Sequence, residues 1–302
     1  MTLYELIGAV EVGLIFGLVA LGAFLSFRVL DFPDLTVEGS FPLGAAVAAI
    51  LIVSLGWNPW PATAAAALAG FAAGAVTAYL NVRFDILHIL CGILVSIALY
   101  SVNLRIMGGP NKSLLGVRTV FSAFDGLGLP TDAINLVVLG VFAAFAKIGL
   151  DLFLATGVGI GIRAAGANPA MAAANGVDVG RMKLLGIGLS NALTAVAGAL
   201  FGQLFGAADV YMGIGVVIIG LASVIAGMSI LPARSVSQAT LGCLVGALFY
   251  RLTVALALNT DFLGLRPSDV QLVTAVLVAL TLAWQARPLK KKAWQQKQKK
   301  VP

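Results

Sequence analysis

Long apolar runs separated by short polar turns make up most of this chain. A run of about twenty apolar residues is the length that an α-helix needs to cross a bilayer, so each run predicts a spanning helix. The pattern predicts an all-α polytopic membrane protein with about eight to ten transmembrane helices. The expected apolar segments are 3–30, 31–55, 62–82, 86–107, 133–156, 184–205, 213–231, 236–258 and 270–284.

Two segments are expected to be broken helices. Residues 31–47 read DFPDLTVEGSFPLGAAV, in which Pro33, Gly39 and Pro42 interrupt the helix. A second polar turn leads into a glycine-rich half-span at 209–219. Broken helices at membrane depth occur where they face protein or a water-filled path. Because the predicted topology sets the two half-helices in opposite directions, we expect an inverted repeat whose positive dipole ends favour a carboxylate.

The longest polar interval in the middle of the chain is 163–183, RAAGANPAMAAANGVDVGRMK. Asn168 is a suitable N-cap, Pro169 suits the first helical position, and Asn175-Gly176 offers a left-handed stop. The spacing predicts a helix over 169–174. Its small, smooth surface suits insertion into a groove of another protein, and an ordinary interhelical loop is the alternative.

Composition supports the membrane prediction, because 60% of residues are hydrophobic, 11% are charged and the mean hydropathy is +1.01. The 35 glycines are typical of spans that pack closely through small residues. The formal charge of +6 comes from the last sixteen residues, which hold seven Lys and Arg and no acid. We therefore expect a transmembrane domain over 1–286, with a loop at 158–183, and a basic tail over 287–302 that lies near anionic lipid. Nucleic-acid binding by the tail is a poor second reading.

Orientation follows if the loop and the tail lie in the cytoplasm. The tail and six flanking residues would then be cytoplasmic, against four basic residues outside, which favours an external N-terminus and a cytoplasmic C-terminus. The six are Arg28, Arg83, Arg163, Arg181, Lys183 and Arg234, and the four are Arg105, Lys112, Arg118 and Arg266.

The polar interval resembles the cytoplasmic coupling loop of ABC importer permeases of the branched-chain amino acid and ribose superfamily. The matching positions are Arg163, Gly166, Asn168, Ala170, Gly176 and Lys183. In that superfamily the helix of this loop docks on the ATPase subunit. The resemblance therefore implies an ATPase-coupling role for Arg163, Gly166, Asn168, Pro169, Ala170, Met171 and Gly176.

Two further stretches, 92–115 (GILVSIALYSVNLRIMGGPNKSLL) and 34–47, look like the tryptophan/tyrosine-type subgroup of these permeases. Together the similarities cover nearly the whole chain. They imply a bacterial inner-membrane importer, a homodimer with two ATPase subunits, and a periplasmic or lipoprotein substrate-binding protein. The expected cofactors, ATP and Mg, would be bound by the ATPase and none by this chain.

Polar groups inside the apolar segments are the candidates for a solute path, because they are costly there and usually functional. Each could instead have a structural role, since Ser and Thr often bond back to their own helix and an Asn can join two helices. The candidates are Thr36, Glu38, Ser40, Asn191, Thr194 and Ser223.

No motif for bond-making chemistry is evident. His88 is the one histidine, the spacing of Cys91 and Cys243 suggests two buried thiols and no metal site, and no phosphate-binding Gly-x-x-x-x-Gly-Lys motif occurs. The chain is therefore expected to be a transport subunit, with no catalytic residues, and its energy would come from a partner. The solute stays open among aromatic or branched-chain amino acids and similar small molecules.

Two other functions are alternatives. An ion-gradient-driven transporter or channel would use Glu11, Glu38 or the Lys147–Asp151 pair as a proton site. A lipid-modifying enzyme would need a clustered nucleophile or carboxylate pair that the sequence does not offer.

Overall fold

The computed structural model describes residues 3–127, 130–258, 275–276 and 279. Within these ranges nearly all of the chain is helical. The first half comprises α1 (Leu3–Ala23), its π-helical continuation η1 (Phe24–Val29), α2 (Val37–Val53), α3 (Pro59–Phe84) and α4 (His88–Met107). The second half comprises α5 (Thr131–Ala155), α6 (Gly157–Ala167), α7 (Pro169–Ala174), α8 (Val179–Phe205), α9 (Val216–Ile230) and α10 (Val236–Leu258). The 3-10 helix η2 (Ser122–Leu127) and two short strands, β1 (Asn111–Ser113) and β2 (Ala207–Asp209), complete the described elements.

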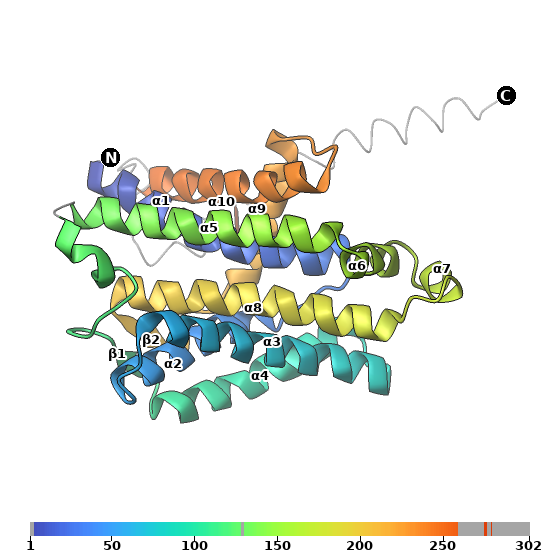
Figure 1. The fold of residues 1–302 in the computed structure, drawn as a ribbon, viewed down its shortest axis with the longest axis horizontal. Coiled ribbons are helices and arrows are strands. Elements are labelled where there is room, and N and C mark those ends of the chain that lie inside the picture. The colour runs from blue at the N-terminus through green and yellow to red at the C-terminus, as the bar shows by residue number, and fades with distance from the viewer. Residues whose placement is uncertain (1–2, 128–129, 259–274, 277–278, 280–302) are drawn as a thin grey trace.

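The long helices lie side by side along the long axis of the molecule (Figure 1). The helices α6 and α7 lie at one end of this bundle, which we call the loop end. The strands β1 and β2 lie at the other end, the strand end, where they pair antiparallel with Asn111 opposite Asp209. The two ends correspond to the two predicted sides of a membrane.

Among the described residues, six helices are long and apolar enough to cross a bilayer, which confirms a polytopic membrane protein. They are Tyr4–Val29, Pro59–Phe84, His88–Met107, Thr131–Ala155, Val179–Phe205 and Val236–Ala257. The two segments predicted to be broken form the shorter helices α2 and α9. The predicted segment 270–284 and the basic tail 287–302 lie outside the described residues, apart from 275, 276 and 279.

The loop between α5 and α8 contains more helix than the sequence predicted. Its predicted short helix is present as α7, with the expected bounds Pro169–Ala174. The preceding residues, expected as loop, instead form α6, for which the Thr156 side chain accepts a hydrogen bond from Gly159 N at 3.2 Å. At the other side of the loop, α8 begins at Val179 and so starts five residues before the predicted 184.

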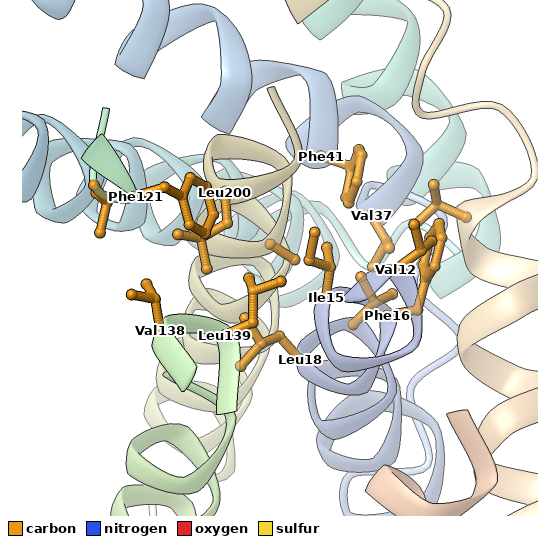
Figure 2. Close-up of a cluster of buried hydrophobic side chains, with 14 of the residues drawn as sticks. Val12, Ile15, Phe16, Leu18, Val37, Phe41, Phe121, Val138, Leu139 and Leu200 are labelled. Atoms are coloured by element: carbon orange, nitrogen blue, oxygen red, sulfur yellow. The ribbon is translucent and has the colours of Figure 1, made fainter. Parts of the chain in front are cut away.

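One apolar cluster joins α1, α2, α5, α8 and α9, and Figure 2 shows part of it. Phe16 on α1 stacks on Phe41 on α2, with ring centroids 6.0 Å apart and planes 5° from parallel. Ile15 and Leu200 are fully buried beside them. This cluster holds the short helix α2 against the centre of the bundle, where the polar groups described below meet.

Small residues let the backbones of α2 and α8 touch. A Cβ added at Gly198 would overlap the carbonyl oxygen of Phe41, and one at Gly44 would overlap the carbonyl of Ala195. In lipid the hydrophobic effect contributes little to helix association, so helices associate through close van der Waals contact of this kind. The predicted small-residue packing is therefore confirmed for this pair of helices.

Lys147 and Asp151, four residues apart on α5, form an ion pair of 2.6 Å. It also reaches α10, because Ser237 Oγ and Thr240 Oγ1 donate to Asp151 at 2.9 and 2.6 Å. Both charged side chains are only 18% exposed. The cluster therefore joins α5 to α10 near the loop end.

Candidate functional site

Two short helices begin next to each other in the middle of the bundle. The helix α2 starts at Val37 and ends near Met107 and Leu114 at the strand end. The helix α9 starts at Val216 and runs to the loop end, where Gly227 packs against Gly242 at the start of α10. The two helices thus run in opposite directions from neighbouring N-termini, as an inverted repeat requires.

Glu38 connects the two N-termini directly. Its Oε1 accepts a hydrogen bond from the backbone N of Gly215 at 3.2 Å, one residue before α9. Gly215 has φ +81°, a left-handed conformation that glycine adopts without strain. A Cβ at Gly213 would overlap the carbonyl oxygen of Glu38, so glycine is also needed there for the close approach. Glycines at 213 and 215 thus allow the close approach and the backbone conformation that the contact with Glu38 needs.

Glu38 is half-buried and has no cationic partner among the described residues. The ion pairs in those ranges are Lys147–Asp151 and Arg181–Asp178. The positive ends of α2 and α9 compensate part of the carboxylate charge. The partly exposed carboxylate therefore remains available to a cationic group such as an ammonium.

An exposed pair of tyrosines joins α4 to the segment just before α9. The hydroxyls of Tyr100 on α4 and Tyr211 are 3.2 Å apart, and the side chains are 40% and 56% exposed. Tyr211 precedes Gly215 by four residues, and Leu99 next to Tyr100 touches the Gly39 position. Neither tyrosine is among the candidates that the sequence suggests, since nothing local in α4 indicates this contact.

A buried polar network lies on the inner side of the same region. Asn191 on α8 accepts a hydrogen bond from Ser40 Oγ at 2.7 Å and donates to Asp34 Oδ2 at 2.6 Å. Thr36 shares a 2.7 Å hydroxyl contact with Thr77 on α3, and its backbone N donates to Asp34 Oδ1 at 2.9 Å. All five side chains are fully buried. In this conformation the network joins α2, α3 and α8.

The other predicted path residues bond within their own helices. Thr194 Oγ1 donates to Ser190 O at 3.1 Å, and Ser223 Oγ donates to Ile219 O at 2.7 Å. Both side chains are buried. Of the six path candidates, Glu38 alone is partly exposed in this conformation, and the path roles of the other five stay predictions for another state of the protein.

The α7 helix has the capping that its sequence predicts. Asn168 Oδ1 accepts a hydrogen bond from Met171 N at 3.0 Å, and Gly176 has φ +81° after the last turn. Ala170 and Met171 point outward, with Met171 65% exposed, while Ala172 is buried at 4%. The outer face of α7 is therefore small, apolar and accessible.

Three further positions of the resemblance lie on the helices that flank α7, two on α6 and one on α8. Arg163 is exposed and lines a cavity at the loop end, whereas Gly166 packs against the backbone of Val29 and Leu30. Lys183 on α8 donates to Asn81 Oδ1 at 3.0 Å, which joins α8 to the end of α3. The residues on either side of α7 thus contact the end of η1 and the end of α3, and α8 itself follows the loop.

Comparison with known proteins agrees with this architecture. Residues 6–284 match the family model described as branched-chain amino acid transport system / permease component. A tyrosine transport system permease protein of Clostridioides difficile (strain R20291) is 37% identical over 279 residues, 92% of this chain and 90% of that protein. An uncharacterized protein of Rickettsia prowazekii (strain Madrid E) is 32% identical over 92% of this chain and 96% of its own length.

Two solved structures share the fold at low sequence identity. PsaBC from Streptococcus pneumoniae in complex with Fab matches with a TM-score of 0.51 and 14% identity, over 92% of this chain and 89% of that one. An inward-facing structure described as a metal-chelate type ABC transporter matches with a TM-score of 0.52 and 19% identity, over 94% and 86%. With a family match over nearly its whole length, this chain belongs to the permease components of the branched-chain amino acid transport system family.

Proposed function

We propose that this chain is the membrane subunit of a bacterial ATP-driven importer for an amino acid, with aromatic amino acids favoured. The observation that carries the proposal is the meeting of α2 and α9 at Glu38, within a chain of this permease family. The tyrosine transport permease of Clostridioides difficile supports the aromatic class. The working assembly would be a homodimer with two ATPase subunits and a substrate-binding protein.

In this account the solute passes by Glu38. A zwitterionic amino acid offers an ammonium group to the Glu38 carboxylate, and an aromatic side chain could stack on Tyr100 or Tyr211. The carboxylate of the solute would be favoured by the nearby helix N-termini. Thr36, Ser40, Asn191, Thr194 and Ser223 would reach the path when the helices rearrange.

ATP hydrolysis would be transmitted through α7. Its exposed Ala170 and Met171 would enter a groove of the ATPase, and Asn168 and Pro169 would fix the start of the helix. Arg163, Gly166 and Gly176 would hold α7 to the ends of the spans. The loop end would then be cytoplasmic and the N-terminus external, which agrees with the positions of the basic residues.

Uptake by proteoliposomes tests the energy source. The permease is reconstituted with its ATPase and binding protein, and uptake of labelled tyrosine, tryptophan and leucine is measured with ATP inside. We expect uptake that requires ATP and persists when ion gradients are dissipated. Uptake driven by a proton gradient in the absence of ATP would favour an ion-coupled transporter instead.

The same vesicles test Glu38. Glu38→Gln keeps the shape of the side chain and an oxygen for Gly215 N but removes the charge, so we expect uptake at limiting substrate to fall about tenfold or more. Glu11→Gln removes another carboxylate from an apolar segment and is the matched control, expected to keep most of the uptake. If Glu38→Gln takes up substrate as fast as Glu11→Gln and the parent do, Glu38 does not contribute to the path.

A further inference from the structure

A cavity of about 650 Å³ lies at the loop end, away from Glu38. Its walls come from η1, α6, the ends of α5 and α9, the start of α10 and the turn between α9 and α10. Three arginines from separate elements line it, namely Arg28, Arg163 and Arg234, together with a single carboxylate, Asp31. Apolar side chains, including Phe24, Phe27 and Met228, form the rest of the lining.

The arginines of this cavity are not neutralised by other described residues. The ion pairs in the described ranges involve Lys147 with Asp151 and Arg181 with Asp178, and none of the three arginines. Arg28, Arg163 and Arg234 are all exposed, so their guanidinium groups can reach a ligand. Three arginines against one Asp leave an excess of two positive charges. Arginine keeps its charge and binds phosphate oxygens in pairs, so the cavity is suited to a phosphate-bearing anion.

The cavity lies at the depth of lipid headgroups. Arg28 is in the last turn of the span Tyr4–Val29, Leu154 ends the span Thr131–Ala155, and Val236 begins the span Val236–Ala257. The ends of spans mark the boundary between the hydrocarbon and the water. A cavity at this depth that is lined by both arginines and apolar side chains matches an amphipathic ligand with a phosphate at one end.

We propose that this cavity binds the headgroup of an anionic phospholipid from the leaflet at the loop end. Arg28 and Arg234 pair with its phosphate oxygens, and Arg163 contributes from α6. The first acyl carbons contact Phe24, Phe27 and Met228. Since α6 continues into α7, the bound lipid holds together the helix ends that surround the exposed face of α7. Inorganic phosphate carries the same oxygen groups without acyl chains, so it is the free anion that could bind the same arginines.

Native mass spectrometry of the full-length permease in neutral detergent tests the proposal. Dioleoyl phosphatidylglycerol and dioleoyl phosphatidylcholine are titrated separately, and the fraction of chains with a bound lipid is measured. We expect phosphatidylglycerol to bind about tenfold more tightly than phosphatidylcholine, because only the former carries a net negative charge. Inorganic phosphate at millimolar concentration should not displace it, since phosphate lacks the acyl contacts.

Three variants locate the site. Arg28→Gln/Arg234→Gln removes two of the three positive charges that line the cavity and should abolish the preference for phosphatidylglycerol. Arg83→Gln is the matched control, because Arg83 is exposed at the same end but outside the cavity, and it should bind as the parent does. Ala233→Trp keeps every charge and narrows the cavity, so it should also weaken phosphatidylglycerol binding.

Several results would overturn the proposal. Equal binding of both lipids by the parent, or equal loss in the Arg83→Gln control, would show that the cavity is not a selective lipid site. Displacement of phosphatidylglycerol by inorganic phosphate alone would assign the arginines to a free anion. Weaker binding of the ATPase by the double variant, with unchanged lipid binding, would assign them to a protein contact.

Discussion

Asn191 on α8 donates a 2.6 Å hydrogen bond from Nδ2 to the buried carboxylate of Asp34, 157 residues away in the sequence. The same side chain accepts a hydrogen bond from Ser40 at the start of α2. One amide group thereby fixes both the chain before α2 and the first turn of α2. Glu38, which lies in that first turn, depends on this network for its position.

Removing the amide should destabilise the protein. Asn191→Leu leaves the Asp34 carboxyl group and the Ser40 hydroxyl with one partner fewer in a buried place, at a cost of about 1–3 kcal/mol. The thermal unfolding midpoint of the purified permease in detergent measures this cost. Thr194→Val is the control, because the Thr194 hydroxyl bonds only to the carbonyl of Ser190 in its own helix. An unfolding midpoint of Asn191→Leu as high as that of the control would contradict the role given to the network.

Because α2 and α8 are in close contact, a larger side chain at their interface should destabilise the protein. Gly198→Val would drive side-chain atoms into the carbonyl of Phe41, and overpacking of this kind costs about 1–3 kcal/mol or more. Gly140→Ala on α5 has open space around it and should leave stability nearly unchanged. Yield of monodisperse protein and the unfolding midpoint check both variants. A Gly198→Val protein that matches Gly140→Ala would show that α2 and α8 can separate freely.

Much of α7 could be predicted from sequence because its determinants are local. The cap at Asn168, the proline after it and the glycine at 176 lie within nine residues; the first two mark the start of the helix, and the glycine marks its end. The α6 helix was missed because its glycines read as loop. Its one local signal, Thr156 as an N-cap for Gly159 N, was read as the end of the preceding span.

The contacts of the polar residues could not be predicted in the same way. Sequence reasoning selected Thr36, Glu38, Ser40 and Asn191 as polar groups in apolar segments, but it passed over Asp34. The partner that buries Asp34 comes from a helix far along the chain, and no single sequence reports such a contact. For the same reason the tyrosine pair and the pairing of β1 with β2 appear only in the folded structure.

Variants of the Lys147–Asp151 pair test whether the pair has a structural role or is a proton site. Asp151→Leu alone leaves Lys147 without its partner in a mostly buried place and should lower the unfolding midpoint clearly. Lys147→Met/Asp151→Leu removes both charges and should recover most of the stability. We expect the double variant to keep ATP-driven uptake within about twofold, because a neutral pair can pack in place of a buried ion pair. Loss of uptake in a stable double variant would instead support the ion-coupled alternative.

The two ends of the bundle should be accessible from opposite sides of the membrane. Single cysteines at Asn111 on β1 and at Asn175 after α7 are introduced where Cys91 and Cys243 have been replaced by alanine. An impermeant maleimide added to intact cells should label the cysteine at 111 only, and that at 175 should react only after the membrane is opened. Labelling of position 175 in intact cells would reverse the orientation.

The proposed coupling role of α7 depends on its exposed outer face. Met171→Arg places a charge on the exposed face that would enter the ATPase, where an unpaired buried charge costs several kcal/mol, on the order of desolvation penalties in proteins. Leu115→Arg, on an exposed side chain beyond β1 at the strand end, is the control. Both proteins should insert and fold normally.

The decisive measurement is substrate-stimulated ATP hydrolysis by the complete complex, with the permease, the ATPase and the loaded binding protein reconstituted together. We predict that Met171→Arg loses at least about nine-tenths of the stimulated rate and releases the ATPase during purification, since tenfold corresponds to only about 1.4 kcal/mol. The Leu115→Arg complex should hydrolyse ATP as the parent does. A Met171→Arg complex that stays assembled and hydrolyses ATP at the parental stimulated rate would contradict the coupling role of α7.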